Sequence, residues 1–157
     1  MRMNSKMAEL LDNLEIDLSN PLNVMTTCSP PELVSAEESI FLQDEYAGAK
    51  HLSLSDFQDR TGHECFVNHV HFAVSDDKAT KMRIIGYSLT LQKLLQPLST
   101  GRKFSIIVSV ADQTGTVRFH QFRPSEPWLA EDLEGYEEAV LEISTIEYVS
   151  EGREAAA

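Results

Sequence analysis

The sequence predicts an α+β fold, in which a small, mostly antiparallel sheet of about four strands carries one long helix and helical N-terminal decoration. Three observations predict it. The chain has 157 residues, 42% of them hydrophobic, which suits the core of one domain. Two alternating segments flank a turn at 112–115. A stripe of apolar residues with helical spacing runs through 78–98.

Residues 1–50 are predicted to form a helical extension or arm that precedes a single α+β domain at 51–149. Apolar residues at positions 7, 10, 11, 14 and 18 follow helical spacing, so an amphipathic helix is expected over 6–18. A loop rich in Thr, Ser and Pro follows at 23–31. Ser35 can cap a second, short helix that runs towards Leu42.

The middle of the chain predicts a strand and then the long helix. Residues 64–74 alternate, which places Phe66, Val70, Phe72 and Val74 on one face of a strand. Asp76 and Asp77 can cap the helix over 78–98. A hairpin with a second strand over 82–89 is the alternative, because Gly86 and two adjacent isoleucines fit a helix less well.

A hairpin is the clearest prediction for the C-terminal part. Its strands are expected over 104–111 and 116–123. Pro124 and Pro127 interrupt the pattern, and 128–136 is expected to be short helical or irregular structure. Residues 139–148 predict the last strand, and 150–157 a frayed tail.

Charge is distributed unevenly along the chain, whose formal net charge is −12. Residues 1–50 hold nine acidic and three basic residues, 51–123 hold six and nine, and 124–157 hold ten and one. The acidic C-terminal third would attract basic partners and repel nucleic acid. The alternative is that the acids serve solubility alone.

Several functional classes lack their signals in the sequence. No apolar run reaches the length of a membrane span and no secretory leader is apparent, so a cytoplasmic protein without a membrane partner is expected. The cysteines, Cys28 and Cys65, are expected to be reduced. No phosphate-binding loop, dinucleotide fingerprint or nucleophile elbow is present, so neither an enzyme nor a cofactor is predicted.

The candidate partner-binding site surrounds the single tryptophan of the chain. Aromatic anchors among carboxylates suit a basic protein surface, because buried aromatics supply affinity and charges supply rate and selectivity. Alternatively, Trp128 and Leu133 cap the edge of the core while the acids face water. The predicted binding residues are Glu126, Trp128, Glu131, Asp132, Glu134, Tyr136, Glu137 and Glu138.

A metal site on the strand predicted over 64–74 is the alternative candidate. His63, Cys65, His69 and His71 share the same parity there. Two histidines separated by one strand residue point the same way about 6.5–7 Å apart, which would suit two ligands of a zinc ion. The spacing matches no zinc-finger or zinc-protease pattern, and a solvated or partner-facing sheet surface is the favoured interpretation.

Five segments together resemble the small immunity proteins of bacterial polymorphic-toxin systems. They are 59–62 (DRTG), 64–71 (ECFVNHVH), 117–120 (VRFH), 123–129 (RPSEPWL) and 132–137 (DLEGYE), within residues 52–147. The resemblance implies a non-enzymatic cytoplasmic protein that neutralises a cognate toxin by occlusion. Many such toxins act on nucleic acid and carry basic clefts. A metal-dependent enzyme, or a regulatory module that dimerises through a sheet edge or the N-terminal helix, is the alternative.

Overall fold

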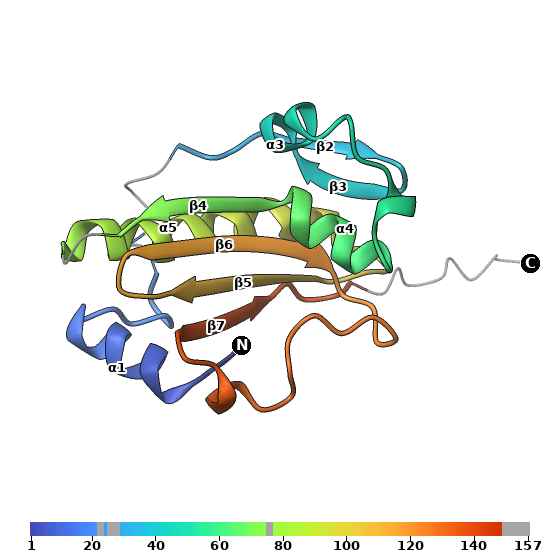
Figure 1. Ribbon diagram of the computed structural model, residues 1–157. Coiled ribbons are helices and arrows are strands. Elements are labelled where there is room, and N and C mark those ends of the chain that lie inside the picture. Colours follow the sequence, from blue (N-terminus) through green and yellow to red (C-terminus); the bar gives the residue numbers. More distant parts are fainter. Residues whose placement is uncertain (22–23, 25–28, 75–76, 149–157) are drawn as a thin grey trace, which may run out of the picture.

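A five-stranded antiparallel sheet forms the centre of the molecule (Figure 1). The computed structural model describes residues 1–21, 24, 29–74 and 77–148. The spatial order of the strands is β1 (Arg2–Met3), β7 (Ala139–Ser144), β5 (Phe104–Val110), β6 (Thr114–Gln121) and β4 (His69–Ala73). Helix α5 (Lys78–Leu95) covers one face, and a 3₁₀ turn, η2 (Gln96–Leu98), extends it. The predicted α+β class is confirmed.

The main core lies between α5 and the sheet. Alternate residues of β5, from Phe104 to Val110, belong to one buried cluster with Ile84 and Leu91 of α5. Gly115 of β6 lets the helix approach closely, because a Cβ atom there would lie 2.4 Å from Cδ1 of Ile84. The long helix is thus confirmed, and the alternative hairpin over 82–89 is wrong.

The C-terminal half follows the predicted order. Strands β5 and β6 form the expected hairpin, with Val108 opposite Val117, and β7 pairs with the other edge of β5. A single 3₁₀ turn, η3 (Leu133–Gly135), is the only helical or strand element that the structure describes between β6 and β7. The tail predicted at 150–157 lies outside the described residues.

The N-terminal residues join the main sheet and its core. Helix α1 (Ser5–Asn13) is shorter than predicted, and it follows a two-residue strand, β1, that pairs with β7. Met7 and Leu11 of α1 lie in the same buried cluster as the residues under α5. A strand of two residues has no detectable alternation, so the pattern of the sequence could not indicate this attachment.

A separate hairpin replaces the helix predicted from Ser35 to Leu42, and that prediction is wrong. Strands β2 (Leu33–Ala36) and β3 (Ser39–Leu42) pair across Glu37 and Glu38, whose φ angles are 52° and 63°. Such turns normally contain Asn or Gly, so the sequence carried no signal for this one. The short helix α3 (Gln43–Gly48) follows.

A helix also replaces the first half of the strand predicted over 64–74. After the 3₁₀ turn η1 (Leu54–Asp56), helix α4 (Arg60–Val67) begins where the side chain of Asp59 accepts a hydrogen bond from Gly62 N at 2.7 Å. The chain turns at Asn68, whose buried side-chain oxygen Oδ1 accepts a hydrogen bond from Leu42 N at 2.8 Å. Asp59 therefore starts α4, and Asn68 separates it from β4, so only His69–Ala73 is a strand. Among the described residues, no helix is long and apolar enough to cross a membrane.

Candidate functional site

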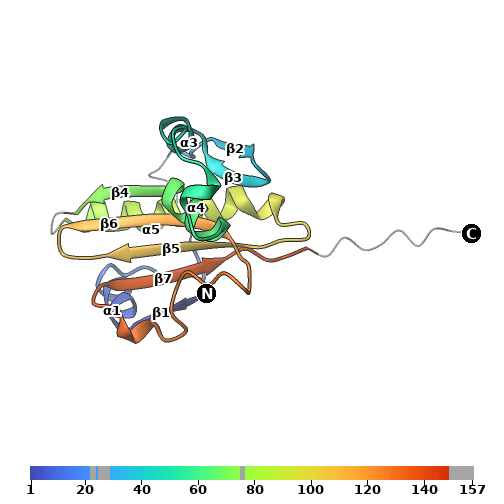
Figure 2. The same cartoon turned by 45° about the vertical axis from the view of Figure 1, so that its right-hand side comes forward.

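The sheet has a polar face on the side opposite α5, which we call the open face. The pairing of β4, β6 and β5 places His69, Arg118 and Ile107 in one row across it, with Thr116 and Ser109 in neighbouring rows. Helix α4 covers the end of β6, and residues 124–138, the acidic loop, run past β7 beside α1 and β1 (Figures 1 and 2). Part of the open face stays accessible between them.

Basic side chains from the N-terminus hold the acidic loop. Nη1 of Arg2 donates to the carbonyl oxygens of Ala130 and Glu131, at 3.2 and 2.9 Å. Nζ of Lys6 donates to the carbonyl oxygen of Tyr136 at 2.9 Å. These bonds go to backbone carbonyl oxygens and not to the carboxylates of the loop. The loop therefore has its conformation before a partner arrives, which lowers the entropy cost of binding.

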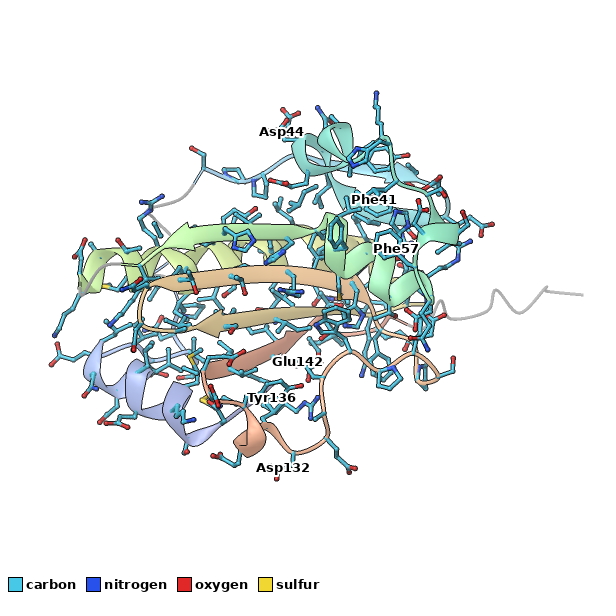
Figure 3. The ribbon with its side chains drawn as sticks, viewed as in Figure 1. Phe41, Asp44, Phe57, Asp132, Tyr136 and Glu142 are labelled. Carbon is cyan, nitrogen blue, oxygen red and sulfur yellow. The ribbon has the colours of Figure 1, made fainter. Side chains whose placement is uncertain are left out.

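Arg2 also binds a carboxylate of the sheet. Its Nε donates to Glu142, which in turn accepts a hydrogen bond from Ser105. Burial opposes the charge of Glu142, but the hydrogen bonds from Ser105 and Arg2 hold its pKa below the ordinary value. The Glu142 carboxylate is therefore part of the anchoring of β1, and Figure 3 shows it on the sheet near Tyr136.

Three of the predicted binding residues are used inside the protein. Glu134 accepts hydrogen bonds from the N–H and the hydroxyl of Ser5, both at 2.7 Å, at the start of α1. Glu126 accepts from the Thr61 hydroxyl at 3.0 Å. Asp132 accepts from Glu134 N at 3.0 Å and caps η3. These carboxylates shape the acidic loop.

The other predicted residues remain available at the surface. The Trp128 side chain is 41% exposed. Glu131 and Glu137 are exposed and Glu138 is half-buried, and none of these three carboxylates has a hydrogen bond or ion pair within the described residues. Tyr136 is half-buried, and its hydroxyl accepts a hydrogen bond from Ala130 N at 3.0 Å.

A buried ion pair anchors the beginning of the loop. Glu64 of α4 is 1% exposed, and its Oε1 lies 2.7 Å from Nη2 of Arg123. Its other oxygen accepts from Gln121 N at 2.7 Å. Sequence reasoning missed this pair, because the two residues are 59 positions apart and no local pattern links them.

The proposed metal ligands fall into two separate places. His63 and Cys65 lie on α4, where the ring of buried His63 is 5.3 Å from that of Phe41 and 5.0 Å from that of Phe57, both labelled in Figure 3. Burial raises the pKa of the Cys65 thiol. The assumption that all four ligands share one strand is wrong, because 60–67 is helical. No group of three His, Cys, Asp or Glu residues in the described part of the chain could hold a metal ion.

His69 and His71 do share the open face, as the alternation of β4 predicted. Their ring centroids are 4.0 Å apart. Nε2 of His69 lies 3.1 Å from Nη2 of Arg118. Burial, and then the charges of Arg118 and His71, lower the pKa of His69 to about 4. His69 is therefore neutral at pH 7 and accepts the hydrogen bond from Arg118.

A groove of about 520 Å³ lies between the acidic loop and the open face. Ile107, Ser109 and Arg118 contribute to its sheet side, and Trp128 and Tyr136 to its loop side. The guanidinium carbon of Arg118 is 5.3 Å from the centroid of the Trp128 ring, a cation–π contact. Sequence reasoning missed Arg118, since only the pairing of β4 with β6 brings it beside His69.

Comparison with known proteins places the chain in a family without assigning an activity. No curated protein and no solved structure matches it. One family model, described as the uncharacterized protein PM0498 family, matches residues 2–151. That range includes β1, the hairpin β2–β3, the whole main sheet and the acidic loop. The chain therefore belongs to the uncharacterized protein PM0498 family.

Proposed function

We propose that this protein is a non-enzymatic, cytoplasmic binding protein of the bacterial immunity type, which neutralises a cognate toxin domain by occluding its basic surface. One observation supports this best. The acidic loop presents an exposed tryptophan together with three carboxylates that have no partner within the described residues, and contacts from the N-terminus already fix its backbone.

Each part of that observation has a role in binding. A tryptophan that becomes buried at the centre of an interface is a frequent source of affinity. Carboxylates around it attract a basic partner and increase the association rate. A toxin that acts on nucleic acid needs a basic cleft, so it offers the complementary charge. A pre-formed loop loses little conformational freedom on binding.

We assign this role to a subset of the predicted binding residues. Trp128, Glu131, Glu137 and Glu138 are the proposed contacts, and Tyr136 supports them from a half-buried position. Changing Glu134 or Glu126 would disturb the fold of the loop, because both accept hydrogen bonds from other elements. Those two positions are therefore unsuitable for testing partner binding.

The experiment measures binding to the toxin domain encoded next to this gene. We expect the double substitution Glu131→Lys and Glu137→Lys to slow association about tenfold or more at low salt and to weaken its salt dependence. The matched control is Asp44→Lys with Glu45→Lys on α3, which changes the same charge at exposed residues at the opposite end of the molecule from the loop (Figure 1). The control should change association much less.

Trp128→Ala tests the anchor separately. We expect it to weaken the complex about 30-fold or more, mainly through faster dissociation, and to abolish protection in cells that co-express the toxin. If the wild-type protein does not protect these cells and does not bind the toxin, the proposed function is wrong. If it protects but neither variant changes binding, the acidic loop is not the interface.

A further inference from the structure

We propose that the groove between the acidic loop and the open face binds a small organic carboxylate, with Arg118 receiving the carboxylate group and Trp128 and Tyr136 flanking an apolar body. This ligand differs from the protein partner proposed above, and the inference does not depend on that partner.

Arg118 is half-buried, and no carboxylate among the described residues forms an ion pair with it. Arg2, Arg60 and Arg123 each pair with a glutamate. Burial lowers the pKa of Arg118, and of the described groups only the thiol of Cys65 acts in the opposite direction. Arg102 is likewise half-buried without an ion pair among the described residues, but its Nε donates to the carbonyl oxygen of Leu98 at 2.9 Å, whereas Arg118 donates to His69 alone. An anionic ligand would neutralise a charge that burial disfavours.

The surroundings of Arg118 hold its guanidinium group in place for such a ligand. Neutral His69 accepts one of its five N–H donors at 3.1 Å, and the Trp128 ring lies 5.3 Å from the guanidinium carbon. The described residues accept no other hydrogen bond from it, and it lines the groove. A planar carboxylate matches the remaining donors in a two-bond arrangement.

The charge around the groove favours a monoanion. Arg118 supplies one positive charge, while Glu138 also lines the groove and the whole chain carries −12. A dianionic phosphate would need more cations than the groove provides, and Glu138 would repel it. A carboxylate requires only the single guanidinium.

The rest of the groove indicates what the carboxylate is attached to. Half-buried Leu129 lies beside the two aromatic side chains, and buried Ile107 and Val140 lie beneath the groove, which suits a flat apolar body. The hydroxyls of Ser109 and Thr116 line the same space and form no hydrogen bond with described residues. A volume of about 520 Å³ is within the ordinary range for small-molecule sites.

The test uses the full chain and the fluorescence of Trp128, which is its only tryptophan. Benzoate is the probe, and benzamide is a neutral control of the same shape. We expect a saturable fluorescence change with benzoate and at least tenfold weaker binding of benzamide. Arg118→Gln should weaken benzoate binding at least tenfold, to the affinity of benzamide. Lys93→Gln removes the same charge from an exposed position on α5 and should leave benzoate binding unchanged.

The comparison of the two probes requires no variant, so the proposal can be tested even if Arg118→Gln fails to fold. Equal binding of benzoate and benzamide by the wild-type protein would overturn it, as would wild-type benzoate affinity in a folded Arg118→Gln variant. The wild-type protein could fail to bind benzoate while Arg118→Gln loses toxin binding. In that case the carboxylate that pairs with Arg118 belongs to the partner protein. That result would also overturn the small-molecule proposal, while leaving the proposed immunity function intact.

Discussion

Replacing Asn4 with alanine tests the idea that the N-terminus organises the acidic loop. Asn4 is 1% exposed, and its side chain takes part in four hydrogen bonds. Its Oδ1 accepts from Met7 N and Val140 N, both at 3.0 Å. Its Nδ2 donates to the carbonyl oxygens of Glu138 at 2.8 Å and Leu133 at 3.3 Å. One small side chain thus joins α1, β7 and the end of the acidic loop.

The expected loss of stability follows from these bonds. Removing the N-cap bond to Met7 costs about 1 kcal/mol. Leaving the buried N–H of Val140 without an acceptor costs about 1–3 kcal/mol more. The two carbonyl oxygens can turn to water once the loop loosens, so they add little. We expect Asn4→Ala to lower the free energy of unfolding by about 2–4 kcal/mol, a large part of the roughly 5–15 kcal/mol typical of a domain.

Urea unfolding followed by circular dichroism measures this loss. The matched control is Asn13→Ala, at the exposed end of α1, which should change the free energy of unfolding by about 0.5 kcal/mol or less. Asn4→Asp keeps the accepting oxygen but places a buried carboxylate oxygen against the carbonyl oxygens of Glu138 and Leu133, so at pH 7 it should cost no less than Asn4→Ala. Hydrogen exchange of residues 130–138 should accelerate in Asn4→Ala. If Asn4→Ala is as stable as Asn13→Ala, the anchoring of the loop through Asn4 is refuted.

Three further predictions concern the core, the buried ion pair and pH. Gly115→Ala should lower stability by about 1–3 kcal/mol, because the added Cβ would meet Ile84 in a filled core. Glu64→Gln should cost about 3 kcal/mol, because it removes the carboxylate that binds Arg123 and leaves that charge half-buried. The stability that depends on neutral His69 should decrease as the pH falls from about 6.5 to about 4, since the unfolded chain binds a proton in this window that the folded protein excludes.

Each of these predictions has its own measurement and control. Urea unfolding of Gly115→Ala in an Ile84→Val background should show a smaller loss, because that variant lacks the Cδ1 atom that causes the clash; an equal loss contradicts the packing argument. Glu38→Gln removes an exposed member of another ion pair and should cost far less than Glu64→Gln. In a His69→Gln variant, the change of stability between pH 6.5 and 4 should become shallower, and an unchanged slope would show that His69 is not its source.

Local signals in the sequence were enough for much of the fold. The alternation of 104–110 and the apolar stripe of 78–98 each depend on residues within a single element. The strand and the helix that they predict are both present. The predictions failed where a few residues decide the conformation. Glu37 and Glu38 adopt positive φ angles that their side chains do not favour, and Asp59 and Asn68 set the two ends of α4.

The sequence by itself located the tryptophan, the density of acidic residues around it and the shared face of His69 and His71. Only the tertiary structure decided which of these groups are available. Glu134 binds Ser5 across 129 positions, Arg118 meets His69 across 49, and β1 pairs with β7. Hydrogen bonds and ion pairs depend on distances of a few ångströms in space. Residues far apart in the chain acquire such distances only when the sheet is assembled, so no local pattern can reveal them.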